Sequence, residues 1–433
     1  MIILPYIARP TYADFAPILP ETAGERWNGP AELGTNTVVT YSFARPGSFP
    51  TGNEHDASFI KGYRSFTDSQ EAATRYVLSM IEDFSGLRFV EVATGGMVDL
   101  QVAIPQDSDT PVTGYADLPY TYSGMQPLAS DIGMIDRDFA RPGTDGFLTL
   151  MHEIGHALGL HHTFGREDEV PRPNDFDDNS VMTYTIDRSP AEVFGSFDKA
   201  ALRYLYGSSA SARDLDITLT SKGIVRTVAG HEDDAVHGSF ERNVIVGRGG
   251  DDMLYGNFRA DRLLGGNGSD RLDGAAGADL LRGGRGGDTL FGGRGDDRLG
   301  GGAGRDRLIG EDGNDRLVGG GQNDRLWGGD GNDRLIGAAG ADRLAGGTGA
   351  DLLIGGNGAD TFVFTQSDIG SSDTIRDFGR GADRIDLSSV ADAFEDVTVE
   401  RDAEGDLILQ VAEVSIRLQD SADMTLTSED FLF

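Results

Sequence analysis

The apolar residues of this chain follow two different patterns. In residues 1–207 they alternate with polar residues at 36–43 and 98–104, where β-branched side chains are also frequent, and this period of two predicts strands. From Gly247 onwards, an apolar residue instead recurs at every ninth position. Such a change of period predicts domains of different architecture.

Three other stretches of the first part predict helices. The first covers about 69–84, with Asp68 as a plausible N-cap and Gly86 as a stop. The others cover about 147–158 and 197–206. Together with the strands, these helices predict a domain of α+β class.

The second part repeats the nonapeptide Gly-Gly-x-Gly-x-Asp-x-Leu-x. Each unit predicts a glycine-rich loop and a three-residue strand whose leucine points inward. Two units would make one turn of a right-handed parallel β-roll. The first glycine occurs in every unit from Gly247 to Gly355, and we expect it to supply a turn geometry closed to residues with a side chain. A flexible glycine- and aspartate-rich linker is the alternative, which the strict phasing disfavours.

Stacked loops of this kind would align carbonyl and carboxylate oxygens, the hard ligands that calcium prefers, at one ion per loop. Without calcium the aligned carboxylates would repel one another, so we expect the repeats to fold only on binding it. Arg259 and Gln322 replace the fourth-position glycine, which predicts weak or empty sites beside them. The predicted calcium ligands are Asp252, Asp261, Asp270, Asp279, Asp288, Asp297, Asp306, Asp315, Asp324, Asp333, Asp342, Asp351 and Asp360.

Position seven of the repeat is often arginine, which we interpret as an outward-facing row that offsets part of the aspartate charge. These arginines are Arg262, Arg271, Arg298, Arg307, Arg316, Arg325, Arg334 and Arg343.

The composition narrows the possible partners. With 71 acidic and 37 basic residues, the net charge of −34 disfavours binding to nucleic acid or to anionic membranes. The absence of cysteine excludes disulfides, thiolate zinc ligands and a cysteine nucleophile. No apolar run approaches the ~20 residues of a membrane helix, so we expect no membrane insertion.

Four of the seven histidines lie within residues 152–162. His152 and His156 are about one helical turn apart, so both rings would project from one face of the predicted helix, with Glu153 beside them. Gly159 can end that helix, after which the chain would present His162 as a third ligand. Three neutral nitrogens leave a fourth position open, as in catalytic zinc sites. The alternative is a group of surface or structurally satisfied histidines, and His161 is interpreted as a bystander.

This spacing, H-E-x-x-H-x-x-G-x-x-H, matches the metzincin motif at every specified position. Ser180-Val181-Met182-Thr183-Tyr184 resembles the Met-turn of the serralysins, the bacterial secreted metzincins, and the repeats resemble those of the repeats-in-toxin (RTX) family. The resemblance implies that Met182 packs beneath the metal. It also implies that Tyr184 can bind zinc and swing away to stabilise the transition state; an ordinary core tyrosine is the alternative. Thr163 departs from the family, which usually has proline there.

The resemblance to the serralysins also implies a secretion pathway and a domain organisation. No cleavable signal peptide is visible at the N-terminus, and the family carries an uncleaved C-terminal signal for type I export from Gram-negative bacteria. We expect a monomer. The implied parts are a short propeptide or N-terminal extension (1–25), a zinc protease domain (26–207), a connecting β region (208–246), a calcium-binding RTX β-roll (247–363) and a C-terminal β region with the secretion signal (364–433).

The implied function is that of a secreted zinc endopeptidase acting on extracellular proteins, with one catalytic Zn²⁺, several structural Ca²⁺, and Glu153 and Tyr184 as catalytic residues. One rival is a calcium-dependent adhesion protein with an inert protease-like domain. A second is another RTX enzyme such as a lipase, although residues 1–246 contain no Gly-x-Ser-x-Gly motif.

Overall fold

The computed structural model divides the chain into two compact units. The first comprises Met1–Asp214 and Ser239–Glu241, and the second comprises Leu215–Gly238 and Arg242–Phe433. Each unit has its own hydrophobic core. Among the described residues, no helix is both long and apolar enough to cross a bilayer. The structure describes residues 36–43, 66–92, 100–103, 114–116, 130–134, 145–158, 199, 201–202, 206, 215–239, 241–379 and 382–433.

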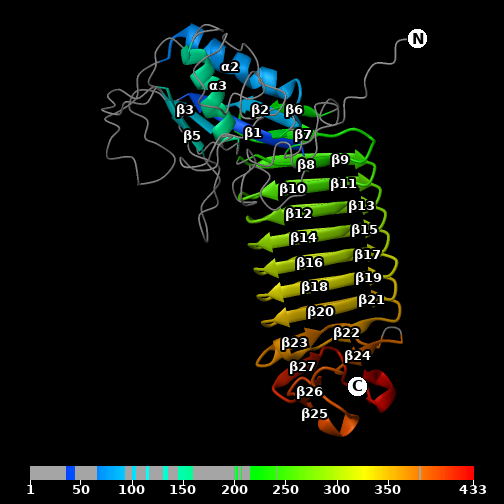
Figure 1. Ribbon diagram of the computed structural model, residues 1–433. Helices are drawn as coiled ribbons and strands as arrows, with labels where there is room; N and C mark the ends of the chain where they lie inside the picture. Colours follow the sequence, from blue (N-terminus) through cyan, green and yellow to red (C-terminus); the bar gives the residue numbers. More distant parts are fainter. Residues whose placement is uncertain are drawn as a thin grey trace, which may run out of the picture. The chain divides into compact units, whose positions relative to one another are not determined.

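A mixed sheet forms one layer of the first unit (Figure 1). Its described strands lie in the order β2-β1-β3-β5-β4, all parallel to their neighbours except β4, which runs antiparallel to β5. The strands predicted at 36–43 and 98–104 are confirmed as β1 and, over its described residues, β3. The bounds are β1 (Asn36–Phe43), β2 (Leu87–Glu91), β3 (Leu100–Ala103), β4 (Gly114–Ala116) and β5 (Ser130–Met134).

Helix α2 (Asp68–Glu82) confirms the first predicted helix but corrects its N-cap. The cap is Thr67, whose Oγ1 accepts the Gln70 backbone N–H at 3.3 Å while Gln70 Oε1 accepts the Thr67 N–H at 3.0 Å. Asp68 instead lies in the first turn. Both residues are good caps, and the glutamine three positions after Thr67 decides between them by closing this reciprocal pair.

Helix α3 (Asp145–Ala157) confirms the second predicted helix and packs by one face into the core. Phe147, Leu150 and Ile154 are fully buried in a cluster that also contains residues of α2 and β1. The hydroxyl of Tyr206 donates a 2.9 Å hydrogen bond to the Leu158 carbonyl, which satisfies a carbonyl just beyond the helix end. Of the third predicted helix, residues 199, 201–202 and 206 are described, and all are helical.

The second unit confirms the predicted parallel β-roll (Figure 1). Successive strands of the repeat alternate between two sheets, so each strand pairs with the one 18 residues away, as Leu254 does with Leu272. The repeat strands are β10 (Met253–Asn257), β11 (Arg262–Asn267), β12 (Arg271–Ala275), β13 (Leu280–Arg285), β14 (Thr289–Arg294), β15 (Arg298–Ala303), β16 (Arg307–Asp312), β17 (Arg316–Gly321), β18 (Arg325–Asp330), β19 (Arg334–Ala339), β20 (Arg343–Thr348), β21 (Leu352–Asn357) and β22 (Thr361–Val363).

Strands before and after the repeats continue both sheets. The parallel pairs β8–β10 and β7–β9 extend the roll on the N-terminal side, and β21–β23 and β22–β24 extend it on the C-terminal side. An antiparallel β25-β26-β27 meander then joins β23 through β27. The bounds are β6 (Asp216–Leu219), β7 (Val225–Val228), β8 (Ala235–His237), β9 (Asn243–Gly249), η3 (Gln366–Asp368), β23 (Ser372–Ile375), β24 (Arg384–Asp386), η4 (Phe394–Asp396), β25 (Thr398–Arg401), β26 (Leu407–Val411), β27 (Val414–Leu418), η5 (Ser428–Asp430) and β28 (Phe431–Leu432).

The apolar residue at position eight of each repeat points into the roll, as predicted. From Leu254 to Phe362 these side chains are at most 2% exposed. The strands are longer than the three residues predicted, because the extended backbone continues through the glycines that open the next unit; β15, for example, has six residues. The paired strands thus stack leucine on leucine along the whole core.

The first glycine of each unit is required for a reason other than the predicted turn geometry. Gly301 does not have a positive φ, but a Cβ built on it would lie 2.3 Å from Oδ2 of Asp306 in the same unit. The left-handed backbone occurs one residue later, at Gly302, and even at Arg248 and Glu311 with φ of 79° and 77°. The first glycine therefore makes room for a carboxylate.

Adjacent glycines of β15 give a matched test of this explanation. Gly301→Ala should destabilise the calcium-loaded protein by about 1–3 kcal/mol, the usual effect of overpacking. Gly300→Ala, whose Cβ would have no atom within 4 Å, should be neutral or stabilise by roughly 0.4–1 kcal/mol. Chemical denaturation of both variants in calcium would measure the difference, and equal effects would contradict the explanation.

Candidate functional site

Helix α3 places two of the predicted zinc ligands together. The rings of His152 and His156 lie 4.7 Å apart between centroids, at an interplanar angle of 87°. Both side chains are partly exposed, whereas Phe147, Leu150 and Ile154 on the same helix are buried. The periodicity that buries one face in the core therefore leaves both imidazoles accessible from one side.

Glu153 follows the first histidine and is only 7% exposed. Burial raises the pKa of its carboxyl group to about 7. A carboxyl group with a pKa in this range can both accept and return a proton at neutral pH.

Two imidazoles one helical turn apart are a donor set that suits zinc. The rest of the predicted zinc centre lies outside the described residues: Gly159, His162, Met182 and Tyr184.

The predicted calcium ligands form two columns, one along each edge of the roll. In every unit, Oδ1 of the aspartate accepts the backbone N–H of the residue 18 positions earlier, as Asp306 does from Asp288 at 2.8 Å. All thirteen such hydrogen bonds measure 2.6–2.9 Å. Each carboxylate therefore links its own turn of the roll to the previous one.

The second carboxylate oxygen of each repeat aspartate, Oδ2, takes no part in these hydrogen bonds. In all thirteen aspartates Oδ2 is buried and has no hydrogen-bond partner within the described part of the chain. The residues themselves are at most 3% exposed. Because buried polar atoms almost always have a partner, a column of orphaned carboxylate oxygens fits a bound hard cation.

Burial also raises the pKa values of these aspartates. Desolvation is the main cause that raises the pKa of Asp279 and Asp351 to about 8 and that of Asp252 and Asp288 to about 7. Neighbouring aspartates in the same column raise these values further. The charged form is thus unfavourable in the folded roll unless a cation neutralises it.

Two aspartates outside the predicted set continue the two columns beyond the repeats. Oδ1 of Asp373 accepts the Asp351 N–H at 2.9 Å, and Oδ1 of Asp383 accepts the Asp360 N–H at 3.0 Å. Their spacings of 22 and 23 residues break the 18-residue period, so periodicity alone could not find them. The carboxylate of Asp377 likewise accepts the N–H groups of two glycines in β21, Gly355 and Gly356.

The two units without a fourth-position glycine keep the same aspartate geometry. Oδ2 of Asp261 and of Asp324 is buried and unpartnered there too. Gln322 adopts the left-handed conformation, with φ of 75°, that glycine would take more easily. Weaker calcium binding beside Arg259 and Gln322 stays a prediction.

A separate acidic group lies between β25 and β26. Asp402, Glu404 and Asp406 place carboxylate oxygens within 4.8 Å of one another. The guanidinium of Arg417 forms ion pairs with all three residues, at 3.1 Å to Asp402 and 2.9 Å to Asp406. Because Arg417 pairs with each of the three carboxylates, the group is a salt-bridge network and differs from the unpaired columns of the roll.

The raised pKa values of the repeat aspartates predict how the calcium-free roll responds to pH. An aspartate has a pKa of about 3.9 when unfolded, so between about pH 4 and pH 8 the folded state binds more protons, and its stability falls as pH rises. In a chelator, the β-sheet circular dichroism should therefore be stronger at about pH 5 than at about pH 8. With calcium the trend should reverse, because protons compete for the ligands. High salt, which screens surface charge, serves as the control; loss of the effect there would contradict a buried origin.

Comparisons with known proteins find a repeat family and several bacterial proteases. Residues 230–364 match the RTX calcium-binding nonapeptide repeat (4 copies) in overlapping segments. Serralysin of Proteus mirabilis is 29% identical over 222 residues, covering 44% of each chain. Metallopeptidase AprA of Pseudomonas marginalis is 28% identical over 203 residues, covering 42% of each.

Serralysin G of Dickeya chrysanthemi is 27% identical over 209 residues, covering 44% of this chain and 43% of that protein. The chain thus matches less than half the length of each of these relatives. The predicted likeness is confirmed at this level: the chain is similar to the serralysins and carries RTX calcium-binding repeats over residues 230–364.

Proposed function

We propose that this chain is a secreted zinc-dependent endopeptidase whose C-terminal half folds around calcium. The observation that carries the proposal is the arrangement on α3, where two accessible imidazoles flank a buried glutamate of raised pKa. Similarity to proteins named serralysin and metallopeptidase supports it.

His152, His156 and His162 would hold the zinc ion, with Tyr184 as a further ligand. When bound, zinc would polarise the peptide carbonyl group and make the attacking water more acidic. Gly159 would end α3 so that the chain returns with His162, and Met182 would pack beneath the metal. Because α3 packs against the core, its two histidines would be held on a rigid element.

Glu153 would carry the proton. Its carboxylate takes a proton from the attacking water and later returns it to the nitrogen of the leaving amine. The phenol of Tyr184 would donate a hydrogen bond to the oxyanion of the transition state, a contact typically worth about 2.7–4 kcal/mol.

The columns of aspartates would hold several structural calcium ions, and folding of the roll would await them. Calcium is scarce inside cells relative to the outside, so such coupling suits a chain that is exported unfolded. We therefore extend the proposal to type I secretion through a C-terminal signal, to a monomeric extracellular product and to a short propeptide at 1–25. The proposed substrates are extracellular proteins.

Removal of calcium should unfold the second unit. In a chelator near neutral pH, the β-sheet circular dichroism should be lost and should return on adding calcium. Asp315→Asn should raise the calcium concentration needed, because it removes a charge from a buried column. Asp312→Asn, at a side chain 64% exposed, should leave it unchanged. A β signal that persists in the chelator would contradict calcium-dependent folding.

Glu153→Gln should lower hydrolysis of casein by about 10²–10⁴-fold while zinc stays bound, because the proton carrier is lost and the ligands are kept. Metal analysis would verify zinc in the variant, and zinc-stripped wild type should also be inactive. Glu395→Gln, the same change at an exposed position, is the matched control.

Hydrolysis by Glu153→Gln at the wild-type rate would show the mechanism to be wrong. Inactive wild type that is zinc-loaded and free of any propeptide would favour the adhesion-protein alternative.

A further inference from the structure

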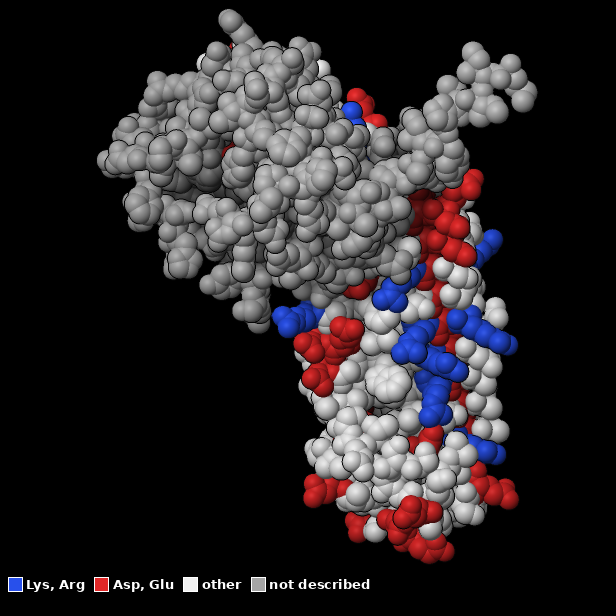
Figure 2. All heavy atoms as spheres, in the orientation of Figure 1, with Lys and Arg blue, Asp and Glu red and all other residues white. Residues whose placement is uncertain are grey.

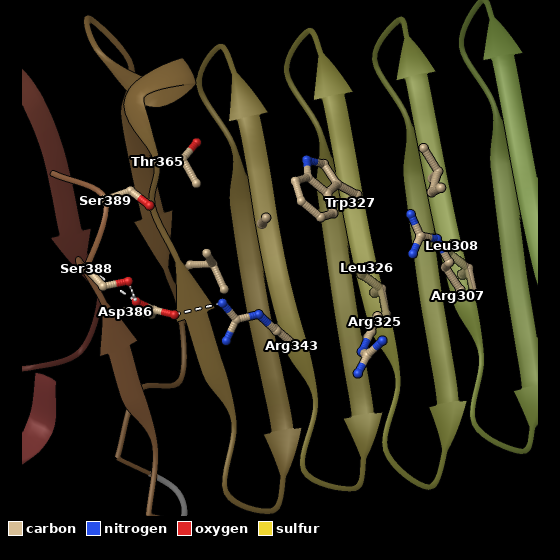
Figure 3. A pocket seen from close by; sticks show the side chains of 13 residues that line it. Arg307, Leu308, Arg325, Leu326, Trp327, Arg343, Thr365, Asp386, Ser388 and Ser389 are labelled. Atoms are coloured by element: carbon tan, nitrogen blue, oxygen red, sulfur yellow. Dashed lines mark hydrogen bonds and ion pairs between the residues drawn. The ribbon is translucent and has the colours of Figure 1, made fainter. Parts of the chain in front are cut away.

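A pocket of about 490 Å³ lies on the outer face of one sheet of the roll (Figure 3). Strands β16, β18 and β20 form its floor. Thr365, Ser388 and Ser389 border it at the C-terminal end. We call it the arginine–tryptophan pocket, after Arg307, Arg325, Arg343 and Trp327.

The three arginines form a column across the floor. They are register partners on neighbouring parallel strands, so their backbones are about 4.8 Å apart. Arg343 donates a 2.7 Å hydrogen bond to Oδ2 of Asp386. Arg307 and Arg325 are exposed and form no ion pair with any described residue.

Adjacent like charges of this kind are unfavourable without a counter-ion. They stand out on a chain whose net charge is −34. Figure 2 shows basic side chains gathered over the repeat strands beside an uncharged surface. The column therefore presents two unpaired guanidinium groups to an anionic ligand.

An apolar column runs beside the arginines. Ile309, Trp327 and Ala345 are register partners on the same three strands. The indole of Trp327 is 51% exposed, the largest exposure among the large hydrophobic side chains that the structure describes. The equivalent positions on strands β15, β17 and β19 of the other sheet are Gly300, Val318 and Ile336, without an aromatic ring. An exposed indole beside free guanidinium groups has the chemistry of a recognition surface.

We propose that the arginine–tryptophan pocket binds polypeptide segments in which carboxylate side chains stand beside apolar or aromatic ones. Arg307 and Arg325 would clamp a carboxylate through charge-assisted hydrogen bonds. Trp327 and Ile309 would bury the neighbouring apolar side chain. The hydroxyl group of Ser389 at the border offers a partner to the peptide backbone. Those of Thr365 and Ser388 already donate to carboxylates of the chain. The apolar column favours such an apolar side chain over an acidic polysaccharide, whose hydroxyl groups prefer polar partners. The inference does not depend on the proposed proteolytic function.

The test is direct binding to the full-length, calcium-loaded chain. The probe is a fluorescent peptide of alternating glutamate and phenylalanine, and a Glu153→Gln background prevents any cleavage of it. Arg307→Gln/Arg325→Gln should weaken binding by about tenfold or more, the usual effect of losing a charge-assisted hydrogen bond. Trp327→Ala should also weaken it. The double variant Arg307→Lys/Arg325→Lys keeps the positive charge but loses the planar guanidinium groups that bind a carboxylate through two hydrogen bonds. Its affinity for the peptide should therefore be intermediate.

A matched control comes from the other sheet. Arg298→Gln/Arg316→Gln removes the same charge from an equivalent pair of register partners without an aromatic neighbour, and binding should be unchanged. Circular dichroism in calcium would verify that every variant folds.

Three outcomes would overturn the proposal. In the first, the Arg307→Gln/Arg325→Gln and Arg298→Gln/Arg316→Gln variants weaken binding equally, which indicates a general electrostatic effect. In the second, a peptide with glutamine at every glutamate binds as well. In the third, oligogalacturonate binds with the same dependence on Arg307 and Trp327 while the peptide does not bind.

Discussion

The structure of the second unit depends on one buried group, the repeat aspartate. One of its oxygens is tied to the backbone of the previous turn, and the other is buried without a partner in the described chain. The first interaction sets the 18-residue turn, and the second makes that turn unfavourable by itself. A bound cation would resolve the conflict, so in the proposed function the same side chain would both fix the geometry of the roll and link its stability to calcium.

Other features of the repeat follow from the space that this carboxylate occupies. The first glycine is retained because a Cβ would meet Oδ2. The left-handed backbone falls on the next residue, where non-glycine residues are tolerated at some strain. The inward leucines contribute a continuous apolar core, but hydrophobic burial alone does not satisfy the orphaned oxygens.

In the first unit, the candidate site residues are positioned by a helix. On α3, the apolar face packs into the core and the histidines occupy the accessible side, so the helix supplies their mutual geometry. Burial raises the pKa of the Glu153 carboxyl group. One chain thus combines a helix whose packing orients two histidines with columns of carboxylates that each leave one oxygen without a partner in the described chain.

The sequence by itself determined whatever depends on local period: the strand at 36–43, the α3 helix that carries His152 and His156, and the inward leucines and columned aspartates of the repeats. Only tertiary structure decided what depends on neighbours distant in sequence. The first glycine faces a carboxylate, Asp373 and Asp383 join the columns outside the period, and Asp386 reaches Arg343 across 43 residues. The arginines, interpreted from sequence as charge balance, meet Trp327 in one pocket only because parallel pairing aligns every second unit. Periodicity specifies which way a side chain points, whereas its partners are set by packing between chain segments that no local pattern records.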